Sequence, residues 1–579
     1  MIKITGANWD RVNLYLTVEK DFINEAYLLD RNDNKFVLPV KNNVITINIS
    51  NLSKGEMIED GKYFLFIDGE NATLKADLLK RIDSLSKVFK YRSQFYALIV
   101  ELGITEAFDF FITASYMMRN KNYKRNFMLK EGKGLRGKIK VLIKILFPFF
   151  INIFYSCLRV LKPKSNDRIL FLSENDDEPR GNLKALYDYF IENNLGKTKG
   201  MFYNKFKKKS IPVLIKSVVS IAFSDVIVVD NYVPLINTLN IANDQKIVQL
   251  WHAGVGFKSV GYARFGEVGS PHPFKSSHRK YTTAIVDDER LIDIYKEVFA
   301  TSSDIFKAYG MPRLDGYLSK EKINSTVEKL FNDNELLRNK KVILFSPTYR
   351  GIGASKATYD YSKIDFDEVY KFCKENNFVF LIKMHPFIKE KYEIPQEYRT
   401  VIFDYYDYDI NELIYIADIM ITDYSSCAYE FSFFNRPLVF FRYDKELYEY
   451  ERPVHTLDAF TEKQYEVKTS EELINVLAEI KDIDINSRFS NLREQKTDCC
   501  KKIAEEILRW YFESIYFKDF NICNEYCLST IQTFKNKKAS GNDESSIKRN
   551  KWRFPFTWCW VREKRLWSKI SLPNSWWWR

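Results

Sequence analysis

The sequence predicts an α/β protein with two doubly wound parallel sheets, preceded by a small β-rich domain. Residues 1–70 hold short alternating runs that are separated by turn signals such as Asn32-Asp33-Asn34, a pattern typical of antiparallel strands. From Arg168 onward, apolar strands alternate with helical windows, and this pattern pauses near Gly310 and restarts at Val342. Two successive runs of β-α units indicate two parallel sheets in two lobes.

Composition and charge narrow the class of protein. The chain has 579 residues and is 46% hydrophobic, which excludes global disorder and suggests several domains. The net charge of +12 is concentrated in two stretches: 119–164 carries thirteen Lys/Arg and one acid, and 548–579 carries nine and one. The remaining body is net negative, so a uniformly basic nucleic-acid binder is disfavoured and we expect no nucleic-acid partner.

The stretch 71–165 is expected to be helical and basic. Its longest uncharged part, Ile145–Leu158, has fourteen residues, fewer than the ~20 that a membrane-spanning helix needs. Lysines and arginines flank it on both sides, which suits a segment lying on an anionic membrane surface. The alternative is a helix buried between two domains.

Cys499–Phe517 is expected to form a helix that packs against both lobes and braces them. Scattered cysteines without a metal-binding spacing indicate reduced thiols in the cytosol, and we expect no bound metal and no cofactor. The predicted parts are a β-rich domain (1–70), a helical membrane-surface segment (71–165), a first lobe (166–315), a second lobe (316–517) and an extension with a basic, Trp-rich tail (518–579).

Two of the five histidines directly follow predicted strands, one in each lobe. His252 follows Ile247–Trp251, and His385 follows Phe378–Met384. Ligands of doubly wound sheets bind at the carboxyl ends of the strands, and imidazole suits proton transfer or phosphate contact near neutral pH. We therefore expect both histidines to face a shared cleft, the alternative being structural hydrogen-bonded histidines.

Further strand ends in the second lobe carry hydroxyls and cations. The predicted strand Val342–Ser346 runs into Thr348, Tyr349 and Arg350, and Lys383 lies two residues before His385. Ser425 and Ser426 follow the strand Asp418–Thr422 and are expected at the N-terminus of the next helix, where they could bind an anion or simply cap the helix. Together these residues predict a phosphate site in the second lobe.

These motifs together resemble the CDP-glycerol glycerophosphotransferase and CDP-ribitol ribitolphosphotransferase family, which builds teichoic acids and related polymers of Gram-positive bacteria. The resemblance covers roughly residues 168–515. The matching stretches are QLWHAGVGFKSVGYAR (249–264), GMPRLD (310–315), ILFSPTYRG (343–351), FLIKMHPF (380–387) and ITDYSSCAYEFSFFNRPLVFFRYD (421–444).

The resemblance implies two Rossmann-like lobes of the glycosyltransferase-B type and peripheral attachment to the cytoplasmic face of the membrane. It implies a metal-independent transfer of a polyol phosphate from CDP-ribitol or CDP-glycerol to a hydroxyl of a lipid-linked acceptor, with release of CMP. It assigns His252 as general base and His385 as a second catalytic histidine. The residues expected to bind the donor are Gly254, Arg313, Thr348, Tyr349, Arg350, Lys383, Ser425, Ser426 and Glu430.

The finer features place this chain nearer the ribitol-type members. It reads His252-Ala253-Gly254 where glycerol polymerases tend to read His-Gly-Thr, and it carries Glu430 where they carry Asp. Two alternatives stay open: a nucleotide-sugar glycosyltransferase of the same two-lobed fold, and an inactive membrane scaffold. Four further questions stay open: which polyol is transferred, whether the enzyme is a primase or a polymerase, whether it makes wall teichoic acid or capsule, and whether it forms a homo-oligomer.

Overall fold

The computed structural model describes most of the chain between residues 2 and 509. The described residues are 2–53, 55–91, 96–117, 134–163, 167–175, 177–204, 210–252, 260–267, 270–351, 356–451, 464–482 and 496–509. Gly254, the histidine at 455 and the Trp-rich tail of 518–579 lie outside them.

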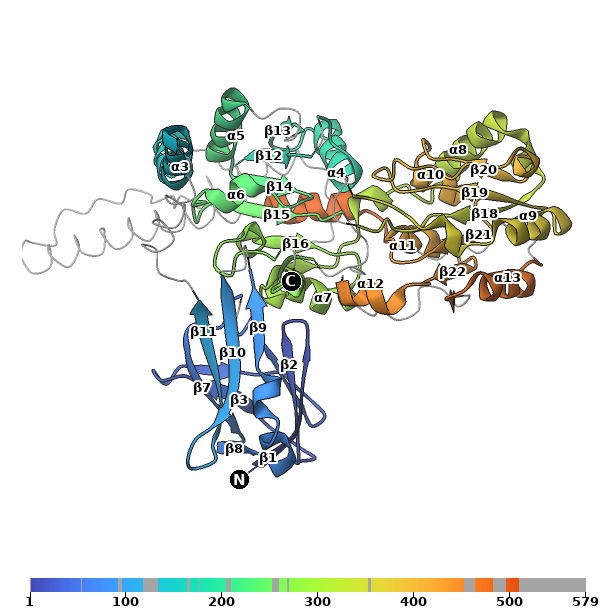
Figure 1. Cartoon of the computed structure of the whole chain (residues 1–579). Helices are drawn as coiled ribbons and strands as arrows, with labels where there is room; N and C mark the ends of the chain where they lie inside the picture. Colours follow the sequence, from blue (N-terminus) through green and yellow to red (C-terminus); the bar gives the residue numbers. More distant parts are fainter. Residues whose placement is uncertain are drawn as a thin grey trace, which may run out of the picture. The chain divides into compact units, whose positions relative to one another are not determined.

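The N-terminal part is built on an eleven-stranded sheet (Figure 1). Its main strand order is β5-β6-β2-β1-β8-β7-β11-β10-β9, and β3 and β4 pair beside β7. β1 pairs with β8 in parallel, so this part is not purely antiparallel. The strands are β1 (Ile2–Asp10), β2 (Asn13–Val18), β3 (Ala26–Leu29), β4 (Lys35–Val37), β5 (Val40–Lys41), β6 (Val44–Asn48), β7 (Gly61–Ile67), β8 (Glu70–Leu74), β9 (Lys87–Lys90), β10 (Ala97–Ile104) and β11 (Phe110–Met117), with the short helices α1 (Ala76–Leu79) and η1 (Ile82–Leu85) before β9.

The expectation that 71–165 is helical is wrong for its first half. β9, β10 and β11 lie there and complete the N-terminal sheet. Along β11, Phe110, Ile112 and Ala114 are buried, as a strand with one buried face requires. The positions on the less buried face are Phe111, Thr113 and Ser115, so the aromatic Phe111 breaks the alternation of apolar and polar residues in the sequence. The β-rich part therefore extends to Met117 and does not end at residue 70.

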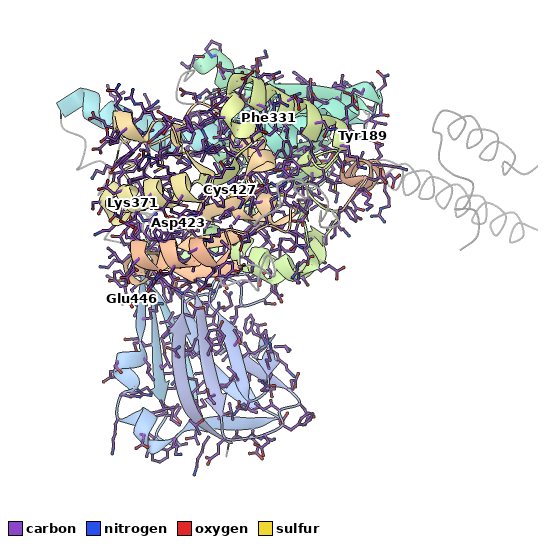
Figure 2. All side chains as sticks on the ribbon, turned by 90° about the vertical axis from the view of Figure 1, so that its right-hand side faces the viewer. Tyr189, Phe331, Lys371, Asp423, Cys427 and Glu446 are labelled. Atoms are coloured by element: carbon purple, nitrogen blue, oxygen red, sulfur yellow. The ribbon has the colours of Figure 1, made fainter. Side chains whose placement is uncertain are left out.

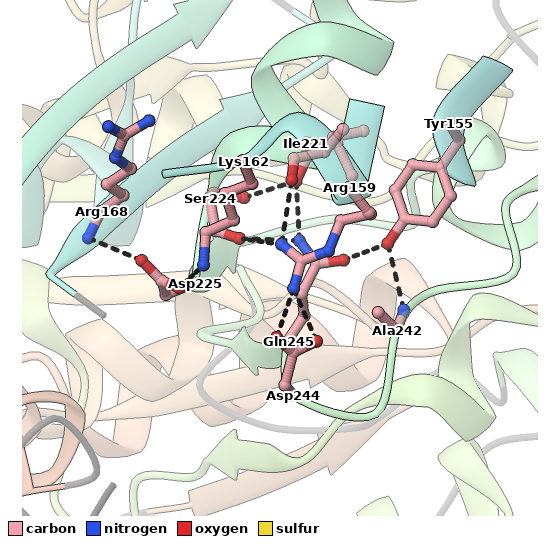
Figure 3. Close-up of polar contacts among 11 residues, drawn as sticks. Tyr155, Arg159, Lys162, Arg168, Ile221, Ser224, Asp225, Ala242, Asp244 and Gln245 are labelled. Carbon is pink, nitrogen blue, oxygen red and sulfur yellow. Dashed lines mark hydrogen bonds and ion pairs between the residues drawn. The ribbon is translucent and has the colours of Figure 1, made fainter. Parts of the chain in front are cut away.

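A long helix, α3 (Gly134–Leu161), follows and holds the predicted membrane segment. Two residues of its last two turns, and Lys162 just after it, contact side chains of the first lobe (Figure 3). Tyr155 bonds to Gln245, Arg159 pairs with Asp244, and Lys162 pairs with Asp225. Ile151 and Tyr155 are also buried in the core of the first lobe, so apolar packing and polar contacts together dock the helix on this lobe.

The first lobe is a six-stranded parallel sheet with the order β13-β12-β14-β15-β16-β17. α4 and residues 499–509 cover one face through Leu183, Phe190 and Ile503, and α5 covers the other through Val218 and Ile221. The elements are β12 (Arg168–Ser173), α4 (Gly181–Glu192), β13 (Lys197–Phe202), α5 (Ile211–Phe223), β14 (Val226–Val229), α6 (Pro234–Thr238), β15 (Lys246–Gln249), η2 (Gly261–Arg264), η3 (Ser277–Lys280), β16 (Thr283–Ile285), η4 (Glu289–Leu291), α7 (Ile292–Phe299), η5 (Ser303–Ile305), β17 (Phe306–Lys307) and η6 (Pro312–Leu314).

The second lobe repeats this plan with the order β20-β19-β18-β21-β22-β23, again all parallel. Its strands are nearly continuous apolar runs because both faces are covered. The elements are α8 (Lys320–Asp333), η7 (Glu335–Arg338), β18 (Lys341–Phe345), η8 (Tyr361–Lys363), α9 (Phe366–Glu375), β19 (Phe378–Ile382), η9 (Gln396–Tyr398), β20 (Ile402–Asp404), α10 (Ile410–Ile416), β21 (Ile419–Thr422), α11 (Cys427–Ser432), β22 (Leu438–Phe441), α12 (Lys445–Glu451), β23 (Gln464–Val467) and α13 (Ser470–Glu479). The predicted fold class, two doubly wound sheets after a β-rich part, is confirmed.

Candidate functional site

Each parallel sheet has one switch point, where the strand order reverses and a crevice forms at the carboxyl ends of the strands. In the first lobe the switch point lies between β12 and β14, and in the second lobe it lies between β18 and β21. The predicted residues Thr348 to Arg350 follow β18, and Ser425 and Ser426 follow β21. In the first lobe, His252 follows β15, the strand next to β14.

The backbone just before His252 is strained. Trp251 has a φ of 53°, the left-handed region that a bulky residue seldom adopts, and such outliers gather at functional sites. Two buried amides hold it in place. The side chain of Asn182 donates to the Trp251 carbonyl at 2.7 Å, and the Gln249 side-chain oxygen accepts from the Trp251 N–H at 2.8 Å.

The His252 ring has a defined proton arrangement. Its Nδ1 lies 3.3 Å from the backbone carbonyl oxygen of Asp230. A carbonyl can only accept, so Nδ1 carries the proton in the neutral ring and Nε2 is the basic nitrogen. His252 keeps an exposed surface, but desolvation by the protein packed around its ring lowers the pKa of His252; the bond to Asp230 acts in the opposite direction, and the positive charge of Arg313 lowers the pKa further. The imidazole is therefore neutral at pH 7 and can accept a proton.

Arg313 links His252 with the second lobe. Its guanidinium donates to the His252 carbonyl at 3.0 Å and forms an ion pair with Glu430, which is buried in the first turn of α11. The backbone N–H of Arg313 donates to the side chain of Asn182 at 3.2 Å. The structure thus brings together three of the predicted site residues, because the Arg313 guanidinium contacts both His252 and Glu430.

The predicted phosphate residue Arg350 is engaged within the second lobe. It makes four hydrogen bonds at 2.6–2.9 Å: two to the carboxylate of Asp444, one to Asp423 and one to the Thr348 carbonyl. Asp423, which Figure 2 labels in the second lobe, is fully buried and also accepts from the Thr348 N–H at 2.7 Å. The described contacts of Arg350 therefore fix the loop at the switch point, and direct binding of phosphate by Arg350 stays a prediction.

Lys383 and His385 do not share the environment that the sequence suggests. β19 ends at Ile382, and the buried Lys383 ammonium donates to the carbonyl of Tyr406. Burial lowers the pKa of Lys383, and nearby aspartates act in the opposite direction. The His385 ring instead packs against Tyr349 at 4.7 Å between centroids, and its Nδ1 accepts from the Phe387 N–H at 3.1 Å.

Ser425 and Ser426 lie at the start of α11, as predicted. Ser426 occupies the N-cap position but its hydroxyl makes no capping bond with the described first turn, and Ser425 accepts a contact from the Cys427 thiol at 3.1 Å. Thr348 is buried, and its hydroxyl has no partner among the described residues. Hydroxyls from both sides of the switch point are thus available for a ligand.

The sequence reasoning missed several polar residues of this region. Asn182, Asp230, Asp423 and Asp444 hold the predicted residues in place, as described above. Asp230 and Asp423 directly follow β14 and β21, so the rule about strand ends could have identified them. Asn182 and Asp444 carry no comparable signal, because their partners are distant in the sequence.

Two doubly wound lobes with polar strand ends at both switch points define a two-lobed α/β protein of the glycosyltransferase-B type. The sequence profile of the CDP-glycerol:poly(glycerophosphate) glycerophosphotransferase family matches residues 153–499. The chain belongs to this family.

Two sequence relatives give the same grouping. The chain is 31% identical over 457 residues to the teichoic acid poly(ribitol-phosphate) polymerase of Bacillus spizizenii, covering 75% of this chain and 72% of that protein. It is 32% identical over 306 residues to the teichoic acid ribitol-phosphate polymerase TarL of Staphylococcus aureus, covering 52% of this chain and 54% of TarL. The structure of the wall teichoic acid polymerase TagF superposes with a TM-score of 0.48 at 18% identity, covering 64% of this chain and 96% of that one.

Proposed function

We propose that this protein transfers a polyol phosphate from a CDP-polyol to a hydroxyl of a lipid-linked acceptor and releases CMP. The observation that carries the proposal is the state of His252: a ring with Nδ1 bound to Asp230, Nε2 basic, and a lowered pKa. A neutral imidazole after a strand end suits the activation of a hydroxyl, which is a weak nucleophile without a base. Membership of the family supplies the class of reaction.

The reaction follows from these groups. Nε2 of His252 accepts the proton of the acceptor hydroxyl while the hydroxyl oxygen forms a bond to the β-phosphorus of the donor. The bond from that phosphorus to the bridging oxygen breaks, and CMP leaves with the electron pair. Hydroxyl and N–H donors of the second lobe, with Ser425, Ser426 and His385 as the proposed contacts, would stabilise the charge that develops on the phosphates.

Ribitol is the proposed polyol. Two named relatives, from Bacillus spizizenii and Staphylococcus aureus, are ribitol-phosphate polymerases, and the His-Ala form at His252 and Ala253 points the same way. Incubation with labelled CDP-ribitol, CDP-glycerol and a UDP-sugar tests both class and polyol. Acceptor-dependent release of CMP from CDP-ribitol supports the proposal, and release of UDP alone would favour a glycosyltransferase.

We also propose that α3 holds the enzyme on the cytoplasmic face of the membrane. Among the described residues, no helix has the length and apolarity that crossing a membrane requires. The docked side of α3 combines the buried Ile151 and Tyr155 with the ion pair of Arg159 (Figure 3). Other apolar residues of α3 are exposed, with Phe149 62% and Phe150 60% exposed. An exposed aromatic face between cationic segments suits the headgroup layer of an anionic membrane.

A further inference from the structure

A cavity of about 260 Å³ opens beside His252 at the switch point of the first sheet. Its walls come from three strand ends: the loop between β12 and α4, the residues after β14, and His252 after β15. Arg313 closes another side. The basic nitrogen and the cavity thus belong to the same crevice, so whatever fills the cavity lies next to the base.

The lining has a distinctive chemistry. Each described residue that lines the cavity is polar, apart from Gly181, which has no side chain. Glu178 and Asp230 supply carboxylates that accept from hydroxyls, and Asn175 and Asn231 supply amides that both donate and accept. Arg180 supplies a cation at the N-cap position of α4, where a helix N-terminus also favours an anion. Such walls match a ligand with several hydroxyls and a phosphate.

Size and polarity exclude other occupants. Drug-sized ligands fill pockets of roughly 300–1,000 Å³, so a cavity of about 260 Å³ holds one small unit. A nucleobase stacks on aromatic side chains, and a lipid tail needs apolar walls, but the described lining offers neither. Among the predicted donor residues, Thr348 to Arg350, Ser425 and Ser426 lie at the switch point of the second sheet, whereas Arg313 lines the cavity itself.

We propose that this cavity binds the terminal polyol phosphate unit of the acceptor chain. Hydroxyls of that unit bond to Asp230 and Asn231, its phosphodiester pairs with Arg180, and its free terminal hydroxyl lies against Nε2 of His252. The proposal rests on the proposed function, because it takes His252 as the base. It adds the residues that recognise the acceptor, and it makes recognition depend on the last unit already added.

Steady-state kinetics with both substrates varied tests this assignment. The variants are Asn231→Ala and Arg180→Ala, and the control is Asn332→Ala on the exposed side of α8. The acceptor is a soluble analogue that ends in one ribitol phosphate. We expect each cavity variant to raise the acceptor KM about tenfold or more, with the KM for CDP-ribitol within twofold of wild type and the control unchanged.

An unchanged acceptor KM, or a rise confined to the KM for CDP-ribitol, would overturn the assignment and leave the proposed function intact. A second experiment covers the case in which the proposed function fails. It measures the binding of free ribitol 5-phosphate by saturation-transfer NMR. If wild type releases no CMP from any CDP-polyol, loss of the ribitol 5-phosphate signal in Arg180→Ala still supports a polyol phosphate site. An equal signal in wild type and Arg180→Ala would refute that site.

Discussion

The side-chain amide of Asn182 donates to the carbonyl of Trp251 at 2.7 Å. The same side chain accepts from the backbone N–H of Arg313 at 3.2 Å. Asn182 is 2% exposed, so water cannot easily replace these bonds. One amide at the start of α4 therefore holds the strained residue before His252 and the residue that links both lobes.

Replacement of Asn182 by Ala is expected to lower kcat more than it alters donor KM. The variant leaves a buried carbonyl and a buried N–H without partners, which costs about 1–3 kcal/mol for such a group. Release of the strained Trp251 backbone then moves His252 away from its position. We expect kcat to fall by about tenfold to a hundredfold. The exposed Asn193→Ala at the other end of α4 is the control, and an equal effect in that control would contradict the role of Asn182.

The pH dependence of kcat/KM reports on His252. Because burial and Arg313 lower the pKa of His252, the neutral and active form persists below the ordinary value of about 6.5. We expect activity to rise with pH through a midpoint below 6.5. Arg313→Gln removes a positive charge, so the midpoint should move upward. A midpoint that stays constant in Arg313→Gln would show that another group titrates.

His278 predicts a loss of stability in acid. Burial lowers its pKa to about 3, and its ring packs among Trp251, Tyr232 and Phe299. Between pH 6.5 and 3, His278 binds a proton in the unfolded chain but stays neutral in the folded protein. The free energy of unfolding therefore falls as the pH falls. The loss from this group is about 2 kcal/mol between pH 6.5 and 5. Denaturant unfolding at both pH values should show a smaller loss in His278→Phe, and equal losses would exclude His278 as the cause.

Removal of Arg350 is expected to destabilise the second lobe. Its loss leaves the fully buried carboxylate of Asp423 without a cation, a situation that costs about 3–5 kcal/mol. Urea unfolding of Arg350→Ala measures this. Arg338→Ala breaks an exposed pair with Glu328 and should cost under about 1 kcal/mol. A fully stable Arg350→Ala that loses only donor binding would instead favour direct contact with phosphate.

The outward face of α3 is tested by flotation with vesicles that contain anionic lipid. Phe149→Ser combined with Phe150→Ser removes two exposed aromatic rings, each of which contributes about 1.5–3 kcal/mol when buried. We expect at least a tenfold drop in vesicle binding, with activity on a soluble acceptor unchanged. Phe22→Ser in the loop between β2 and β3, where Phe22 is 72% exposed, should float like wild type. If wild type, the double variant and Phe22→Ser all float equally, α3 does not contact the membrane.

Much of the fold follows from the sequence, because strands buried on both faces read as continuous apolar runs. β12, β14, β18 and β21 are such runs; Ser425 follows β21 and His252 follows β15, so both lie after strand ends as predicted. β9 to β11 are missed because aromatic and aliphatic residues such as Phe111 lie on their less buried face. Short edge strands such as β17 carry too few residues for a pattern.

The site is less predictable than the fold. A motif indicates that Arg313 and Arg350 matter, but it does not indicate their partners. Glu430 and Asp444 come from elements more than ninety residues away, and only the folded chain brings them close. Asn182 stands in an ordinary first helical turn, so its two bonds to distant backbone have no local signature.

Turnover of CDP-ribitol by wild type and by His252→Ala tests the central claim most directly. CMP release in the presence of a polyol-phosphate-terminated acceptor is measured for both, with CDP-ribitol binding as a check that the variant is folded. The account predicts acceptor-dependent CMP release by wild type and a loss of at least a hundredfold in the variant, with donor binding retained. Full activity of His252→Ala would contradict the account.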